Sequence, residues 1–277
     1  MNKYTVEEVR EELRDLYQKK SLVPFIGAGF SIPLSLPSWD NLLGNLGEQL
    51  GYDRDIFLKL GSLQQLAEYV YREDTKEWKK FLLNISTEFN SHESDEKRRT
   101  SIQHQALSKL DFPVVYTTNY DMHIEKTLEE SGKNVNAISV YEDFIRARKN
   151  NFECEVLKFH GSLEEQDSIV LSESQYFNRM NLEGALDQRL RADALSKSFL
   201  FMGYSFSDPN IRYIFYKLHK LRANVSSTNN RVEFSYITAF GMNDIQAKLL
   251  KQWNIKVIEL DPSNKEKSIS ELLDSLK

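Results

Sequence analysis

The feature that most constrains this chain of 277 residues is a series of short apolar runs, separated by stretches with helical spacing of apolar residues. The runs are LVPFIG, FPVVYTTN, NAISV, CEVLKFHG, SFLFMGYS, EFSYITAF and IKVIEL. Strands that are apolar throughout, rather than alternately apolar and polar, are typical of a parallel sheet covered by helices on both faces. We therefore predict an α/β fold with a Rossmann-like, doubly wound parallel sheet.

The stretches between the apolar runs predict helices with recognisable ends. The first, TVEEVREELRDLYQKK, has Thr5 as its expected N-cap, and Ser38 is expected to cap the helix WDNLLGNLGEQL. Helical spacing also covers residues 62–90, whereas the polar segment NSHESDEKRR predicts a loop. The helix after FPVVYTTN is expected to stop at Gly132, because glycine accepts a positive φ.

No Gly/Ser-rich linker, internal repeat or low-complexity segment divides the chain. We therefore expect one domain over residues 1–277. Residues 51–99 lack an apolar strand, and we expect them to form a helical insertion on the sheet domain.

Composition excludes several classes of protein. Hydrophobic residues make up 40% of the chain, enough for a large core, and a net charge of −5 gives no broad basic surface for nucleic acid or anionic membranes. The single cysteine, Cys154, excludes a multi-cysteine zinc site within the chain, and we expect it to be a buried strand thiol. The charged, helical start is unlike a signal peptide, and no apolar run reaches the ~18 residues of a membrane span. We expect a cytoplasmic protein without a metal.

Small and polar residues follow the first predicted strand, and the carboxyl ends of such strands form the ligand crevice of an open α/β sheet. Gly27 and Gly29 leave room for a diphosphate on backbone N–H groups, Ala28 lies between them, and Ser31 adds a hydroxyl. The pattern is half of the dinucleotide-binding sequence G-x-G-x-x-G, and it suits a tight turn equally well.

Three later strand ends carry further candidates. VVYTTNYD contains Asn119, which suits either a ligand contact or a helix N-cap, and Asp121, which suits either a ligand contact or the helix dipole. His160 ends VLKFH, and its imidazole can accept a proton near neutral pH, although a histidine there is more often structural. Gly203 and Ser205 repeat the pattern in a stretch that also suits a plain helix start.

Taken together and in this order, these residues resemble the sirtuin-like family. The Gly-Ala-Gly-x-Ser phosphate loop of sirtuins is similar to residues 27–31, and their Thr-Gln-Asn-x-Asp strand end is similar to residues 117–121. Their His-Gly pair is similar to residues 160–161, and their later Gly-Thr/Ser-Ser matches residues 203–205 in part. The four matches extend over most of the chain.

The chain also departs from sirtuins that deacylate proteins. No cysteines follow residues 160–161, the Pro-Asp-Phe-Arg segment is replaced by residues 37–40, and the family's glutamine is replaced by Thr118. The Val-x-Phe motif of the acyl-lysine groove is not evident after His160. The sequence is more similar to the zinc-free sirtuin-like domains of prokaryotic antiphage systems, which include the Thoeris effector and the partners of short Argonautes and HerA-type ATPases.

The resemblance implies that NAD⁺ is a substrate, hydrolysed to nicotinamide and ADP-ribose so that an infected cell loses its NAD⁺. It implies that Asn119 holds the nicotinamide ribose and the attacking water, that Asp121 binds the carboxamide, and that His160 is the general base. Trp39 and Asp40 would shape the loop over the site. The residues expected to bind NAD⁺ are Gly27, Ala28, Gly29, Ser31, Asp40, Thr118, Asp121, Gly203 and Ser205.

Other functions fit the same motifs. One alternative is an NAD⁺-dependent protein deacylase, and another is a non-catalytic subunit that binds NAD⁺ or ADP-ribose. The sequence contains neither a P-loop nor a G-x-S-x-G elbow, which argues against a P-loop NTPase and an α/β-hydrolase. Because an uncontrolled NADase would poison its host, we expect control by homo-oligomerisation or by a partner of the HerA-type ATPase or Argonaute-like kind.

Overall fold

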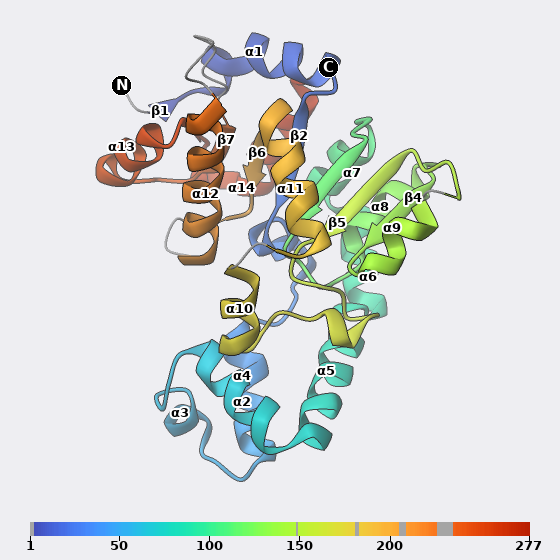
Figure 1. Cartoon of the computed structure of the whole chain (residues 1–277), viewed down its shortest axis with the longest axis vertical. Helices are drawn as coiled ribbons and strands as arrows, with labels where there is room; N and C mark the ends of the chain where they lie inside the picture. Colours follow the sequence, from blue (N-terminus) through green and yellow to red (C-terminus); the bar gives the residue numbers. More distant parts are fainter. Residues whose placement is uncertain (1–2, 148, 181–182, 205–208, 226–234) are drawn as a thin grey trace.

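The computed structural model describes residues 3–147, 149–180, 183–204, 209–225 and 235–277 (Figure 1). Its described residues form an eight-stranded sheet of order β1-β8-β7-β6-β2-β3-β5-β4, and the neighbouring strands pair in parallel. The predicted α/β, Rossmann-like fold is therefore confirmed. The strands are β1 (Lys3–Tyr4), β2 (Leu22–Ile26), β3 (Val114–Thr117), β4 (Val135–Ile138), β5 (Cys154–Lys158), β6 (Ser198–Met202), β7 (Ser235–Ala239) and β8 (Ile255–Glu259).

Both faces of the sheet are buried, as the uniformly apolar strands predict. In β2, Val23 and Phe25 belong to one hydrophobic core and Leu22 and Ile26 to the other, because successive side chains point to opposite faces. The first core also contains residues of α11 (Ala185–Ser196), α12 (Pro209–Val225) and α13 (Asp244–Gln252). The second contains residues of α1 (Val6–Gln18), α7 (Ile102–Ser108), α8 (His123–Glu130) and α14 (Lys265–Asp274).

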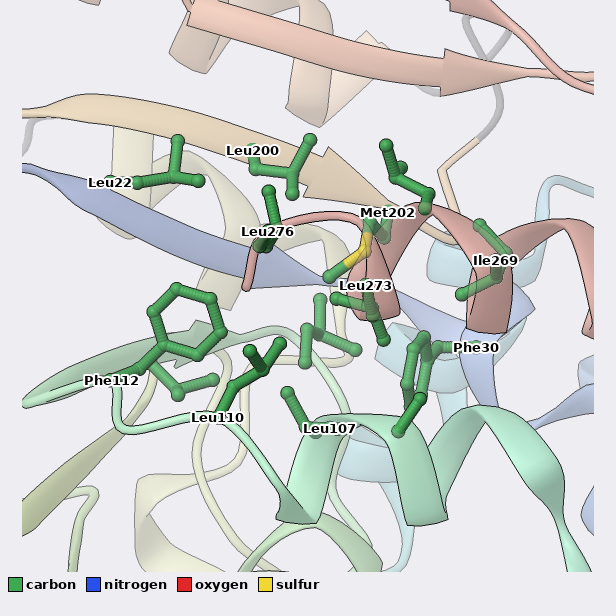
Figure 2. Packing of buried hydrophobic residues seen from close by; sticks show 14 of the residues in the cluster. Leu22, Phe30, Leu107, Leu110, Phe112, Leu200, Met202, Ile269, Leu273 and Leu276 are labelled. Atoms are coloured by element: carbon green, nitrogen blue, oxygen red, sulfur yellow. The ribbon is translucent and has the colours of Figure 1, made fainter. Parts of the chain in front are cut away.

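Helix α14 closes the second face. Figure 2 shows Ile269, Leu273 and Leu276 of this segment gathered with Leu200 and Met202 of β6, with Leu107 and Phe30 nearby. Burial of leucine-sized side chains contributes about 1.5–3 kcal/mol each in area-based terms. The last helix is therefore part of the sheet domain.

A third hydrophobic core lies among the helices between β2 and β3. It contains residues of α2 (Trp39–Gln49), α4 (Leu63–Glu73) and α5 (Thr75–Phe89), and the short α3 (Arg54–Phe57) packs beside it. These helices extend from the sheet domain at the bottom of Figure 1, with α10 (Glu173–Met180) between the two parts. Tyr120 and Leu163, from the loops after β3 and β5, also belong to this core. The helices therefore pack on the loops that leave the carboxyl edge of the sheet.

The predicted helix ends are confirmed, whereas one predicted loop is not. The hydroxyl groups of Thr5 and Ser38 accept from the N–H groups of Glu8 and Asn41, which confirms both predicted caps. Gly132 has a φ of +92° just after α8, as expected. The prediction of a loop for NSHESDEKRR is wrong, because helix α6 (His92–Thr100) forms there.

Helix α6 is polar, and a helix cap and ion pairs stabilise it. Ser91 caps it, Lys97 pairs with Glu93 one turn away, and the buried Arg98 pairs with Asp95 and Glu130. The pairs with Glu93 and Asp95 have helical spacing and could be read from the sequence, whereas the pair with Glu130 joins α6 to α8 and gives no local sign. Within the described ranges, none of the helices combines the length and the apolar character needed to cross a membrane.

Candidate active site at the carboxyl edge of the sheet

Strand register brings four of the predicted motifs to adjoining strand ends. Ile26 of β2 is paired with Met202 of β6 on one side and with Thr117 of β3 on the other, and Thr117 is paired with Lys158 of β5. The residues that follow these partners are the Gly27 turn, Gly203, Thr118–Asn119 and Phe159–His160. After β2 the chain adds β3, β4 and β5 on one side, and β6, β7 and β8 then lie on the other side. The topological switch point, where open α/β sheets bind ligands, therefore lies between β2 and β6.

Ser31 and Asn119 are in direct contact. The side-chain Nδ2 of Asn119 donates to Oγ of Ser31 at 3.0 Å, and the backbone N–H of Asn119 donates to Oγ1 of Thr117. Asn119 is only 5% exposed, and its Oδ1 is buried without a hydrogen-bond partner among the described residues. A buried amide oxygen without a partner is costly, so it is a candidate acceptor for a ligand hydroxyl or water.

The glycines pack backbone against backbone. Gly203 has a φ of +75°, and a Cβ on it would lie 2.4 Å from the backbone nitrogen of Phe30. The N–H groups of Gly27 and Gly29 donate to the carbonyl oxygens of Met202 and Gly203 at 2.8 and 2.9 Å. These two N–H groups, which we expected to face a diphosphate, therefore join the ends of β2 and β6. The glycines permit this close approach, as the tight-turn alternative anticipated.

Tyr204 fills the space beside Gly27. Its hydroxyl donates to the carbonyl oxygen of Ile26 and lies 2.9 Å from Oγ1 of Thr118, and its ring packs edge-on against Phe25. A Cβ on Gly27 would lie 2.6 Å from the Tyr204 ring. Thr118 therefore contacts Tyr204 at the site, a contact that the sequence motif does not show.

Asn119 and Asp121 are not in the helix that follows them. Helix α8 begins at His123 with Met122 as N-cap, so the N-cap alternative for Asn119 is wrong. Asp121 is buried before the helix, and its Oδ1 accepts from the N–H of His123 at 3.0 Å. The position of Asp121 is therefore fixed by a backbone contact as well as by its burial.

A buried ion pair contacts the loop after β3, which contains Asn119 and Asp121. Lys158 and Glu125 have side chains that are 0% and 1% exposed, and their charged atoms lie 3.0 Å apart. Nζ of Lys158 also donates to the backbone carbonyl of Asp121. Burial raises the pKa of Glu125, and the facing ammonium group opposes that change. The sequence signal for this pair is a lysine inside an apolar strand, and the predictions from sequence did not include it.

His160 lies at the end of β5, nearly buried. Its ring packs edge-on against Tyr176 of α10 at 5.3 Å, and its carbonyl accepts from the N–H of Val170. Burial, together with the nearby guanidinium of Arg179, lowers the pKa of His160 from 6.5 to about 3. The imidazole is therefore neutral at physiological pH, and one of its ring nitrogens is unprotonated and can accept a hydrogen bond.

The remaining predicted residues have other positions. Trp39 packs edge-on against Tyr120 and Phe89, which places it in the third core beside the site. Asp40 is exposed in the first turn of α2, and among the described contacts none joins its carboxylate to the strand ends. Ser205 lies outside the described residues.

Three further features of the chain bear on the choice of site. Cys154 is buried in β5, as expected, and burial raises the pKa of its thiol to about 12. In the described part of the chain, no three side chains of the His, Cys, Asp and Glu types gather as metal ligands. A cavity of about 620 Å³ lies against α1, α14 and the end of β8, where it is lined by Arg10 and Arg14 together with acidic side chains. The lining of this cavity mixes basic and acidic side chains, and β8 is separated from β6 by β7 in the sheet. The candidate site is therefore placed at the ends of β6, β2, β3 and β5.

Comparison with known proteins agrees with the geometry. The family model described as "SIR2-like domain" matches residues 113–258, which include the ends of β3, β5 and β6. Over 276 residues the chain is 28% identical to the "NAD(+) hydrolase ThsA" of Acinetobacter baumannii, covering 95% of this chain and 54% of that protein.

Two other relatives are similar over shorter regions. The "NAD(+) hydrolase ThsA" of Enterococcus faecium is 30% identical over 198 residues, covering 71% of this chain and 40% of that protein. The "Defense-associated sirtuin 2" of Bacillus subtilis is 25% identical over 227 residues, covering 78% of this chain and 21% of that protein. The chain thus spans about half the length, or less, of these curated relatives.

Proposed function

Because the chain belongs to the SIR2-like domain family, we propose that it hydrolyses NAD⁺ to nicotinamide and ADP-ribose in antiphage defence. The similarity to proteins named NAD(+) hydrolase supports this proposal. The observation that carries it is the contact of Asn119 with Ser31, beside the strand that ends in His160. An amide with an unpartnered oxygen and a neutral imidazole are thereby held at adjoining strand ends.

The proposed reaction needs few catalytic groups. Water attacks C1′ of the nicotinamide ribose, the glycosidic C–N bond breaks, and its electron pair goes to the nicotinamide nitrogen. Because nicotinamide leaves as a neutral molecule, no acid has to protonate it. The protein has to hold the ribose and place the water.

Each residue has a proposed role in that reaction. Oδ1 of Asn119 accepts from the ribose or the water, and the imidazole of His160 engages a ribose hydroxyl and accepts the proton that the water loses. Since Oδ1 of Asp121 already accepts from His123, binding of the carboxamide falls to its other oxygen. The diphosphate is bordered by the turn after β2 and the neighbouring strand ends, namely Gly27, Ala28, Gly29, Ser31, Thr118 and Gly203. Asp40 and Ser205 remain in the proposal on the basis of the sequence motif alone.

We also propose that residues 1–277 form a single SIR2-like domain in which residues 51–99 are a helical insertion, and that assembly controls its activity. The insertion carries Ile56, Leu60 and Leu83, whose side chains are 59%, 63% and 58% exposed. Large exposed apolar side chains are available to a partner, and we place the contact surface on this insertion for that reason. A second copy or a HerA-type ATPase or Argonaute-like partner would cover them.

Release of free nicotinamide tests the function. Purified protein, alone and with candidate partners, is incubated with NAD⁺, and the same is done with Asn119→Ala and His160→Ala. We expect release by the unaltered chain and a loss of at least ~100-fold in either variant, the usual contribution of a positioned acid or base. Deacylation of an acetyl-lysine peptide without turnover of NAD⁺ alone, or intact bound NAD⁺ after long incubation, would overturn the proposal.

A further inference from the structure

Arg179 lies beside His160 with a side chain that is 18% exposed, and it has unsatisfied donors. It lies near the end of α10, and its guanidinium is 4.2 Å from the centre of the Phe159 ring, the residue before His160. Its Nε and Nη2 atoms are buried without a hydrogen-bond partner among the described residues. Buried guanidinium groups normally satisfy their donors, because leaving them unpaired costs free energy.

The nearby acid does not satisfy this guanidinium. Asp187 lies 3.6 Å from Nη1 of Arg179, beyond hydrogen-bond distance, and its Oδ2 accepts from the N–H of Gly184 at 2.9 Å. The other oxygen of Asp187 is also buried without a described partner. A closed arginine–carboxylate pair would form two parallel hydrogen bonds. This pair is open, so donors of Arg179 are left for another acceptor.

Helix α10 aims Arg179 at the same strand end as His160. Tyr176 and Arg179 are three residues apart and therefore share a face of the helix. Tyr176 packs on the His160 ring and Arg179 on the Phe159 ring, so this face covers the end of β5. The cation also acts on His160 electrostatically, which places the two groups in one environment.

We propose that Arg179 binds the diphosphate of the ligand through Nε and Nη2. This inference rests on the proposed function, because it assigns the ligand of the same site. Nε and Nη2 form the planar fork that matches two oxygens of a phosphate group. The backbone N–H groups of Gly27 and Gly29 already donate to the carbonyl oxygens of Met202 and Gly203, so these two donors are not left for the diphosphate. Arg179 supplies a cationic partner from α10.

ADP-ribose tests the assignment without turnover, because it carries the diphosphate and lacks the scissile bond. Its binding is measured by calorimetry for the unaltered chain, Arg179→Met and Arg179→Lys. We expect Arg179→Met to weaken binding by about tenfold or more, as loss of charge-assisted hydrogen bonds does, and Arg179→Lys to weaken it less. In turnover, the KM for NAD⁺ should rise with kcat changed far less.

Arg189→Met is the matched control, since Arg189 also comes from a helix over β5. Its guanidinium is paired with Glu155 at 2.8 Å and with Asp193 at 3.0 Å, so it has acceptors of its own. Its removal should leave the affinity for ADP-ribose unchanged. Thermal unfolding of each variant shows that it is folded.

The outcomes separate the two proposals. Unchanged ADP-ribose affinity in a folded Arg179→Met variant overturns the role of Arg179, whether or not the chain releases nicotinamide. An unaltered chain that binds ADP-ribose but releases no nicotinamide, alone or with the candidate partners, fails as a hydrolase, while loss of that binding in Arg179→Met still supports Arg179. Absence of ADP-ribose binding by the unaltered chain, with nicotinamide release intact, also overturns the role of Arg179.

Discussion

Nδ2 of Asn119 lies 3.0 Å from Oγ of Ser31 and joins the end of β3 to the turn after β2. The bond fixes the rotation of the amide, so that Oδ1 faces away from Ser31 and stays without a described partner. One hydroxyl thus sets which atom of Asn119 a ligand meets.

Ser31→Ala should therefore lower activity through Asn119. Loss of one hydrogen bond costs about 0.5–1.5 kcal/mol, so we expect kcat for nicotinamide release to fall roughly three- to tenfold. Asn119→Ala should cost far more, and Ser31→Thr, which keeps the hydroxyl, should retain more activity than Ser31→Ala. Equal activities of Ser31→Ala and the unaltered chain would show that the bond has no role in positioning.

Gly203→Ala should destabilise the fold strongly. The new Cβ would lie 2.4 Å from the nitrogen of Phe30, at a φ of +75°. We expect a loss of about 3 kcal/mol or more in the free energy of unfolding, measured with urea, from overpacking added to backbone strain.

Gly241→Ala is the control for Gly203→Ala. Gly241 has a φ of +83°, and a Cβ there would have no heavy atom within 4 Å. It should lose only the strain, about 1 kcal/mol. Similar losses in the two variants would mean that the β2–β6 contact relaxes easily.

Lys158→Met should lower the free energy of unfolding, because it removes one partner of the buried ion pair. It leaves Glu125 without its cation and the carbonyl of Asp121 without its donor. Removing one partner of a buried ion pair typically costs about 3–5 kcal/mol, and we expect that loss in the free energy of unfolding. Lys158→Met combined with Glu125→Leu should recover part of it. A double variant no more stable than the single one would argue against a direct coupling.

Stability should fall as the pH drops from about 7 toward 4. Burial lowers the pKa values of His104 and His160 to about 3 in the folded chain, against an ordinary 6.5. Between these pH values the unfolded state binds more protons, so the stabilisation present above pH 6.5 is lost on acidification.

A histidine variant identifies the source of that slope. Urea unfolding at several pH values should show a shallower slope in His160→Gln, by up to about one proton. An unaltered slope in His160→Gln would show that His160 does not carry a depressed pKa.

Local patterns predicted seven of the described strands and the four strand ends of the candidate site, because each apolar strand and the small or polar residues after it are continuous in sequence. The two-residue β1 was not predicted, because Lys3 and Tyr4 are too few to form a pattern. Arg179 and Tyr204 were not predicted, because their roles arise from strand order and from packing of α10 over β5. The polar segment of α6 was misread for a related reason, since Glu130, which pairs with its buried Arg98, lies on another helix.

Tyr204 donates to the carbonyl of Ile26 and contacts the hydroxyl of Thr118. The phenol thereby connects the ends of β6, β2 and β3, and these three strand ends are held at a fixed separation. A ligand of this site should accordingly gain selectivity for this chain from contacts with the helical layer, where α10 lies, and little from the strand ends themselves.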